Sequence, residues 1–203
     1  MMALCLASGS PRRRELLTAL GYSFTAITTA IAEVPAAGES ALDYVNRLAR
    51  EKSEAAIAQQ KPGDWILGSD TLIALDDKIL EKPNDVEHFC WMMQQLSGRK
   101  HWVHTALALT EVSAAHDVAA QQQRCVTTEV SFKRLTDAEI MHYWHTGEPQ
   151  GKAGGYAIQG FAERFVTRLN GSYSGVIGLP LYETEQLLRS VGFLPNWERV
   201  DEC

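Results

Sequence analysis

The chain has 203 residues, 45% of them hydrophobic and 22% charged. This length and composition predict a globular protein of one sizeable domain, or of two small lobes that share a cleft. A net charge of −6 argues against a general nucleic-acid-binding protein, which needs a basic surface to neutralise phosphates. The four cysteines form no CxxC pair, and no apolar run is long enough to span a membrane. We therefore expect a cytoplasmic protein that stably binds neither nucleic acid nor membranes.

Apolar periodicity and turn residues predict interleaved strands and helices. Because strict alternation is missing, we expect an α/β fold in which helices flank a mixed, twisted sheet. In chain order, the sequence predicts a strand over 3–7, a helix over about 11–20, a strand over 24–29, a helix from Ser40 to about 60, a hairpin over 65–80, a helix over about 85–97, strands over 102–111 and 124–133 with a polar, Ala/Gln-rich connection, a helix from Thr136 to Gly147, a glycine-rich stretch over 151–160, a strand near 164–169 and a last helix from Pro180.

The first predicted helix concentrates positive charge at its start. Ser10 suits the capping position and Pro11 the first turn. Arg12, Arg13 and Arg14 follow where the helix macrodipole is positive, which is unfavourable by ~0.3–1 kcal/mol for each exposed cation. A bound anion would reverse the sign, because the backbone amides and the arginines would both face it. The segment therefore predicts a site for a small anion.

Helical phase distinguishes the three arginines. Arg13 lies at the centre of an apolar stripe that includes Leu16, Leu17 and Leu20. Arg14 lies towards solvent, where an ordinary solvated basic turn accounts for it. We therefore expect Arg13 to face inwards and contact the anion.

Two further charged residues stand where apolar side chains are expected. Lys52 falls in the middle of the apolar stripe of the second long helix, so its ammonium must either extend to solvent or meet an anion. Asp70 lies inside the apolar run 66–73, which predicts a central strand, and a buried carboxylate is costly unless it is paired, protonated or bound to a metal. With positive side chains nearby, including Lys82 after the hairpin, this carboxylate could orient a water or hold Mg²⁺ against a triphosphate.

The opening segment LASGSPRRRELL (6–17) closely resembles the signature of the Maf family of nucleotide pyrophosphatases. Shorter matches follow in the family's order over nearly the whole chain, and together they are highly specific. They are AREK (49–52), GSDT (68–71), LEKP (80–83), LSG (96–98), GSY (171–173) and GLPL (178–181). The resemblance implies an α/β fold with a deep central cleft, related to the inosine-triphosphate pyrophosphatases, and a homodimer.

The resemblance also implies roles for individual residues. The family's catalytic base matches Asp70, and positions associated with substrate choice match Arg12, Thr71 and Gln159. Ala32 stands where close relatives can carry a second acid beside Glu33, but this change removes no catalytic group. The complete predicted site comprises three catalytic residues (Asp70, Lys52, Lys82), six that bind the substrate (Ser8, Ser10, Arg12, Arg13, Thr71, Gln159) and two that hold a divalent cation, either Mg²⁺, Mn²⁺ or Co²⁺ (Asp70, Glu33).

The stretch GGYAIQG (154–160) resembles the branch of the family that acts on dTTP and UTP. The branch that acts on 7-methyl-GTP has an acidic residue near the position of Gln159, which suits a cationic purine. A glutamine amide can accept from pyrimidine N3–H and donate to O4, so it can recognise uracil or thymine, although it can also meet adenine. A glycine-rich surface loop without function is the alternative.

These observations lead to the hypothesis that the chain hydrolyses dTTP, UTP and modified pyrimidine nucleotides to the monophosphate and pyrophosphate. Water activated by Asp70 would attack the α-phosphorus; alternatively, Asp70 is purely a metal ligand. The rival functions are a 7-methyl-GTP pyrophosphatase on the same fold and a non-catalytic, nucleotide-sensing regulator of cell division, because the family is also linked with septum inhibition. A pure regulator would not need Lys52, Asp70 and Lys82 together, which favours the enzyme.

Overall fold

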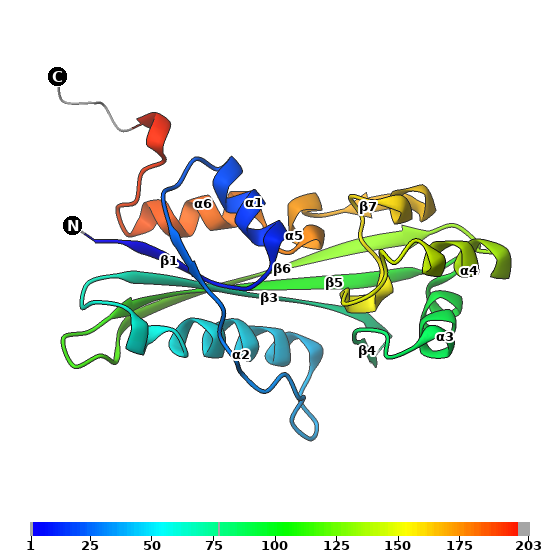
Figure 1. Ribbon diagram of the computed structural model, residues 1–203, viewed down its shortest axis with the longest axis horizontal. Coiled ribbons are helices and arrows are strands. Elements are labelled where there is room, and N and C mark those ends of the chain that lie inside the picture. Colours follow the sequence, from blue (N-terminus) through cyan, green and yellow to red (C-terminus); the bar gives the residue numbers. More distant parts are fainter. Residues whose placement is uncertain (1, 77, 199–203) are drawn as a thin grey trace.

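The structure is a computed structural model that describes residues 2–76 and 78–198. Its strands are β1 (Leu4–Ala7), β2 (Thr25–Ile27), β3 (Trp65–Leu75), β4 (Lys78–Leu80), β5 (Lys100–Val112), β6 (Val118–Phe132) and β7 (Val166–Asn170). They form one seven-stranded sheet in the order β2-β1-β3-β5-β6-β7, with β4 paired to β3 (Figure 1). Strand β1 is parallel to β2 and β3, and the remaining pairs are antiparallel. The mixed sheet predicted from the sequence is confirmed.

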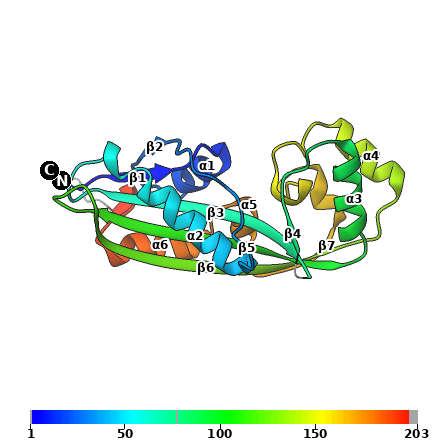
Figure 2. The same ribbon diagram turned by 90° about the horizontal axis from the view of Figure 1, so that it is seen from below.

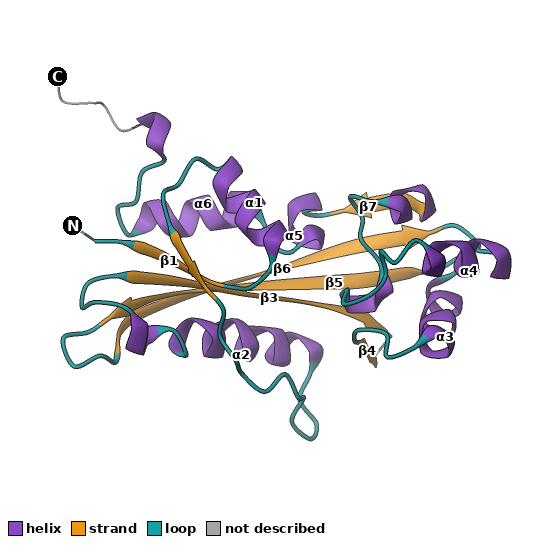
Figure 3. Ribbon diagram, in the orientation of Figure 1, coloured by secondary structure: helices purple, strands orange, loops and turns teal. Residues whose placement is uncertain are grey.

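Helices cover both faces of this sheet, as Figure 3 shows. They are α1 (Pro11–Ala19), α2 (Ala41–Glu54), α3 (Val86–Leu96), α4 (Asp137–His145), α5 (Tyr173–Ile177) and α6 (Leu181–Ser190). Helix α2 packs on one face, whereas α1 and α6 pack on the other (Figure 1). Helices α3 and α4 lie together at the far end of the long strands, apart from α1, α2 and α6 (Figure 2). None of the described helices is both long enough and apolar enough to cross a membrane.

The alternation of side chains along β5 explains why both faces are buried. Ala106 and Ala108 join the core under α2, while Leu107 and Leu109 join the core under α1 and α6. Successive residues of a strand point to opposite faces, so this continuous apolar run serves two cores at once. The small alanines on one face leave room for α2 to lie close to the sheet.

Predicted helix starts agree with the structure. The Ser40 hydroxyl accepts a hydrogen bond from the amide of Asp43, and the Asp85 carboxylate accepts one from the amide of His88 at the start of α3. Thr136, where the sequence predicts the helix to begin, forms a capping box with Glu139 at the start of α4. In each case a side-chain oxygen satisfies an amide that has no partner within the helix.

Three features differ from the prediction. The Ala/Gln-rich residues 118–123 belong to β6, because backbone pairing with β5 holds them although their side chains are mostly exposed; the turn lies at 113–117. Helix α2 ends at Glu54 instead of near 60, and a short 3-10 helix, Ile57–Gln59, follows. Helix α5, with five residues, was not predicted because it is too short to show helical periodicity.

Candidate active site

A cleft of about 1010 Å³ lies against residues 70–73 of β3. Its walls come from the turn before α1, from α2, from the connection after β4 and from the loop 151–160. All of the predicted site residues line it: Ser8, Ser10, Arg12, Arg13, Glu33, Lys52, Asp70, Thr71, Lys82 and Gln159. The structure therefore brings together residues that lie far apart in the sequence.

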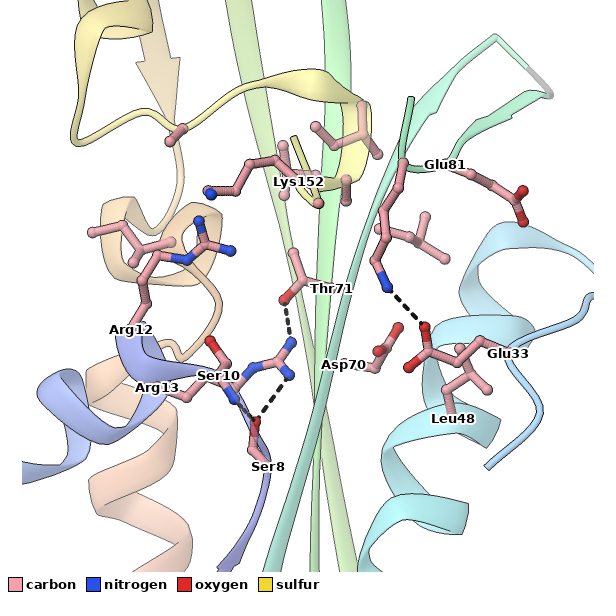
Figure 4. Close-up of a pocket in the computed structure, with 18 of the residues that line it drawn as sticks. Ser8, Ser10, Arg12, Arg13, Glu33, Leu48, Asp70, Thr71, Glu81 and Lys152 are labelled. Atoms are coloured by element: carbon pink, nitrogen blue, oxygen red, sulfur yellow. Dashed lines mark hydrogen bonds and ion pairs between the residues drawn. The ribbon is translucent and has the colours of Figure 1, made fainter. Parts of the chain in front are cut away.

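Arg13 faces inwards, as its helical phase predicts. Its Nε donates to the carbonyl of Gly178 at 2.8 Å, Nη1 donates to Ser8 Oγ at 3.4 Å and Nη2 donates to Thr71 Oγ1 at 3.2 Å (Figure 4). A guanidinium carries five N–H donors, so one N–H on each terminal nitrogen remains for a ligand. Burial lowers the pKa of Arg13, and the negative charge of Asp70 partly offsets this effect.

Thr71 belongs to a directed chain of hydroxyl groups. Its Oγ1 lies 3.0 Å from Thr105 Oγ1, and the Thr105 hydroxyl donates to the carbonyl of Gly175 at 2.7 Å. Because the proton of Thr105 is used in this way, Thr71 must donate to Thr105 while accepting from Arg13. Thr71 therefore has only acceptor capacity left to offer a ligand.

The hydroxyl of Ser8, and not that of Ser10, makes the side-chain hydrogen bonds of the first turn. Ser10 occupies the capping position of α1, but its hydroxyl caps no amide of the helix. Ser8 Oγ instead accepts from the amide of Ser10 at 3.2 Å and from Arg13, which fixes the turn. The Ser10 hydroxyl, on the wall of the cleft, is not committed to capping α1.

Arg12 and Arg14 differ in exposure. Arg14 is exposed to solvent. Arg12 is half-buried on the cleft wall, and its Nε has no hydrogen-bond partner within the described part of the chain. Burial lowers the pKa of Arg12, although the charges of Glu15 and Glu148 oppose this. An anion in the cleft would supply the partner that Arg12 lacks.

Across the cleft, two carboxylates share one ammonium. Lys52 Nζ lies 2.6 Å from Asp70 Oδ1 and 2.6 Å from Glu33 Oε1. Lys82, expected in the neighbourhood of Asp70, lines the same cleft and pairs with Glu33 at 3.2 Å. Burial alone would raise the pKa of Glu33, but hydrogen bonds and charges from Lys52 and Lys82 together hold it below its ordinary value.

A glycine brings Lys52 to Asp70. Gly68 lies two residues before Asp70 on β3, and a Cβ there would lie 2.2 Å from the carbonyl oxygen of Ala49 and 2.8 Å from the amide of Ser53. Only a residue without a side chain allows α2 to lie this close to the strand. Lys52 lies one helical turn after Ala49, so the close packing holds it against the sheet, where it is almost fully buried.

The loop 151–160 forms the opposite end of the cleft. Gly154 adopts φ +65°, and a Cβ there would lie 2.3 Å from Ile73 Cδ1, so the loop rests directly on β3. The backbone amide of Gly154 donates to the carbonyl of Glu81 at 2.9 Å. Gln159 projects from this loop, exposed, and its side chain makes no hydrogen bond to any described residue. The amide of Gln159 is therefore available to a ligand.

Several residues that line the cleft were not predicted, among them Lys152, Glu148 and Tyr44. The Lys152 side chain extends towards the guanidinium of Arg12 (Figure 4), and both burial and the charge of Arg12 lower its pKa. Glu148 and Tyr44 also line the cleft. Burial, followed by the charges of nearby acids, raises the pKa of Tyr44 to about 12. Lys152 lies in a glycine-rich loop that has no periodicity, and Tyr44 fits the apolar stripe of α2. Neither residue therefore interrupts an apolar pattern that would have indicated a site.

The donor set of Asp70 and Glu33 fits a hard divalent cation. Both residues offer carboxylate oxygens, which Mg²⁺ prefers, and Mg²⁺ commonly binds one or two protein carboxylates together with substrate phosphates. Within residues 2–76 and 78–198, no group of three or more His, Cys, Asp or Glu side chains is placed to hold a metal. A cation here would thus take its remaining ligands from phosphate and water.

Comparisons with known proteins place these residues in a family. A family model described as "Maf-like protein" matches residues 3–191. A dTTP/UTP pyrophosphatase of Vibrio parahaemolyticus is 50% identical over 188 residues, which cover 93% of this chain and 96% of the relative. Proteins of the same name from Idiomarina loihiensis (50% identity, 93% and 94% coverage) and Shigella sonnei (47% identity, 96% and 95% coverage) are similar over comparable lengths.

Among solved structures, a nucleoside-triphosphatase / dITP/XTP pyrophosphatase from Mycobacterium abscessus aligns with a TM-score of 0.44 and 16% identity over 93% of this chain and 94% of that one. This likeness is too low to carry a conclusion. The family model and the close relatives, however, cover the chain almost from end to end, and the chain belongs to the family of Maf-like proteins.

Proposed function

We propose that this chain is a nucleoside triphosphate pyrophosphatase that hydrolyses dTTP and UTP to the monophosphate and pyrophosphate. One observation carries the proposal: Asp70, paired with Lys52 at 2.6 Å, faces the same cleft as the guanidinium of Arg13 and the free amide of Gln159. Relatives of about 50% identity that bear the name dTTP/UTP pyrophosphatase support it.

The positive residues provide the binding site for the triphosphate. Arg12 and Arg13 lie on one wall and Lys82 on the other, so phosphates between them would neutralise charge from both sides. The amides of Arg12 and Arg13 precede the first intrahelical hydrogen bond of α1, from Arg14 to Ser10, and can donate to an anion at this end of the helix. Lys152 lies on the loop 151–160, but its side chain extends towards Arg12 (Figure 4), so we assign it to phosphate binding as well.

Asp70 acts as the general base in this proposal. Lys52 holds Oδ1, which leaves Oδ2 to accept a proton from a water molecule. The water oxygen forms a bond to the α-phosphorus as the bond from this phosphorus to the α–β bridging oxygen breaks. Pyrophosphate leaves with the electron pair of that bond, and the cationic side chains of the cleft stabilise its charge. The proton on Asp70 then returns to solvent.

Asp70 and Glu33 are the residues that would hold a divalent cation together with the phosphates. When bound, such a cation supplies positive charge that stabilises the transition state. Lys52 contacts both carboxylates and Lys82 contacts Glu33, so two ammonium groups balance the two carboxylates.

Gln159 recognises the base in this proposal. Its exposed amide can accept from N3–H and donate to O4 of uracil or thymine. Modified pyrimidines that keep this edge would be accepted too, because the amide contacts no other part of the ring. The homodimer and the cytoplasmic location implied by the sequence are further parts of the proposal, and light scattering of the purified protein tests the first.

The deciding experiment measures pyrophosphate release from a panel of nucleotides in the presence of Mg²⁺, Mn²⁺ or Co²⁺. We expect dTTP and UTP to be hydrolysed with the highest kcat/KM and 7-methyl-GTP to be a poor substrate. Preference for 7-methyl-GTP would refute the assignment of Gln159, and failure to release pyrophosphate from any nucleotide, despite tight binding, would favour the regulator.

A further inference from the structure

A single carboxylate and a single phenol fix the loop that carries Gln159. Tyr143, on α4, donates from its hydroxyl to Glu148 Oε1 at 2.7 Å, and the same hydroxyl accepts from the amide of Ala157 at 3.1 Å. The other oxygen of Glu148 accepts from the amide of Phe161 at 3.0 Å. Ala157 and Phe161 stand two residues before and two residues after Gln159, so the loop is held on both sides of it.

The donor and acceptor roles in these hydrogen bonds are fixed by the groups involved. The amide of Phe161 and the hydroxyl of Tyr143 are both donors towards Glu148, so both carboxylate oxygens are needed as acceptors. An amide side chain at this position would offer only one acceptor. Tyr143 is fully buried, and its ring packs parallel to that of Phe161 with centroids 5.5 Å apart. Burial and the bond to Glu148 raise the pKa of Tyr143, so its hydroxyl remains a donor.

Gly160 makes room for the carboxylate. A Cβ at Gly160 would lie 2.1 Å from Glu148 Oε2. The glycine next to Gln159 therefore allows Glu148 to sit against the loop, and any larger residue would push its carboxylate away.

We propose that Tyr143 and Glu148 are positioning residues for substrate recognition: they hold the backbone on either side of Gln159 so that its free amide meets the pyrimidine base in a fixed place. This inference rests on the proposed function, in which Gln159 reads the base. Contacts that fix a residue before the ligand arrives reduce the entropy lost on binding. Of the residues assigned to the phosphates, Arg12, Arg13 and Lys82 lie on other elements, and Lys152 lies on this loop but before the segment 157–161 that Tyr143 and Glu148 hold.

The test compares a ligand that has a base with one that lacks it. In Tyr143→Phe the ring still fills the core, but both hydrogen bonds of the hydroxyl are lost. We expect the Kd for the non-hydrolysable α,β-imido-dUTP to rise about tenfold, while inhibition by inorganic tripolyphosphate changes by less than about twofold. Equal weakening of both ligands would show a general structural effect and overturn the inference.

A double-mutant cycle with Gln159→Ala sharpens the result. If Tyr143 acts through Gln159, Tyr143→Phe has no further effect on α,β-imido-dUTP in the Gln159→Ala background. Additive losses would overturn the inference while leaving the proposed function intact. If Gln159→Ala itself leaves α,β-imido-dUTP binding unchanged, the assignment of the base to Gln159 fails, and the inference fails with it.

Two further variants keep the test independent of folding. Gly160→Ala displaces the carboxylate of Glu148 without changing either donor, and we expect the same selective loss of α,β-imido-dUTP binding. Thr184→Val is the matched control, because it removes another fully buried hydroxyl, one that donates to the carbonyl of Pro180 at 2.7 Å on α6 and does not line the cleft. It should destabilise the fold without altering the ratio of the two affinities; a ratio that shifts as in Tyr143→Phe would contradict the proposal.

Discussion

Lys52 and Asp70 form an ion pair of 2.6 Å in which each side chain is 11% exposed. Removing one partner of a buried pair leaves an uncompensated charge, which costs more than the pair itself contributes. A buried pair of this kind needs further charges nearby to stabilise it. Glu33 pairs with Lys52 and Lys82 pairs with Glu33, so the four side chains form a continuous chain of ion pairs. Such an extended chain at the base of a cleft is well placed to exchange partners with a triphosphate.

The role of Asp70 is tested by Asp70→Asn. The amide keeps an oxygen for Lys52 but cannot accept a proton from water, so we expect kcat for dTTP to fall by at least about 10²-fold. Binding of α,β-imido-dUTP should change little by comparison. Near-normal turnover with retained binding would show that Asp70 is not the base.

The arginines of the first turn offer an internal comparison. Lysine in place of Arg13 cannot contact Gly178, Ser8 and Thr71 at once, so Arg13→Lys should lower kcat/KM for dTTP by about 10- to 100-fold. Arg14→Ala removes a neighbouring charge that is exposed to solvent and should change kcat/KM by no more than about twofold. Similar losses in both variants would mean that only the total charge of the turn matters.

Stability should fall in mild acid because of His101. Burial lowers the pKa of this ring from 6.5 to about 3 in the folded chain. Between these two values the unfolded chain binds more protons than the folded one, so the free energy of unfolding decreases as the pH falls, by up to about 1.4 kcal/mol per pH unit below 6.5. Urea unfolding at pH 7 and pH 5 measures the slope.

His101→Gln is the control for this slope, since glutamine does not titrate and can still contact the hydroxyl of Tyr156. The variant is expected to be less stable at pH 7 but to lose less stability between pH 7 and pH 5 than the unmodified protein. Parallel pH dependence in the two proteins would assign the loss to other groups.

Gly68→Ala tests the close packing of α2 on β3. The added methyl group would meet the backbone of Ala49, which cannot move as a side chain can. Overpacking of this kind costs about 1–3 kcal/mol, and it should also reduce turnover because α2 carries Lys52. Gly147→Ala provides the comparison: Gly147 has φ +73° and open space around it, so that variant measures backbone strain alone. A smaller loss of stability in Gly68→Ala than in Gly147→Ala, with full turnover, would contradict this account.

The sequence predicted the elements that have strong periodicity or clear caps, and it predicted the site residues that break a pattern. Arg13 and Lys52 interrupt apolar stripes, and Asp70 interrupts an apolar strand, which made them visible. Gln159 and Glu33 came only through the family resemblance, because no periodicity surrounds them. Residues 118–123 could not be predicted, since the backbone pairing that makes them a strand depends on β5 rather than on their own side chains.

The anchoring of the Gln159 loop was equally invisible in the sequence. Tyr143 fits the apolar pattern of α4 and Glu148 follows a helix end, as many surface acids do. Only the fold brings the hydroxyl and the carboxylate to amides that lie 13 and 14 residues further along the chain. Long-range hydrogen bonds of this kind leave no local signal.

Because Gly154 contacts Ile73, strand β3 sets the distance between the loop 151–160 and Asp70. In the proposed function, Asp70 and Thr71 face the phosphates, and Ile73 contacts the loop that carries Gln159, with about 3.3 Å of rise for each residue between them. The spacing between the two ends of the cleft is therefore a property of one strand, independent of how either end is built. If the proposed function holds, sequence changes within the loop or the first turn would alter which groups are recognised, whereas the spacing of Asp70, Thr71 and Ile73 along β3 would stay the same.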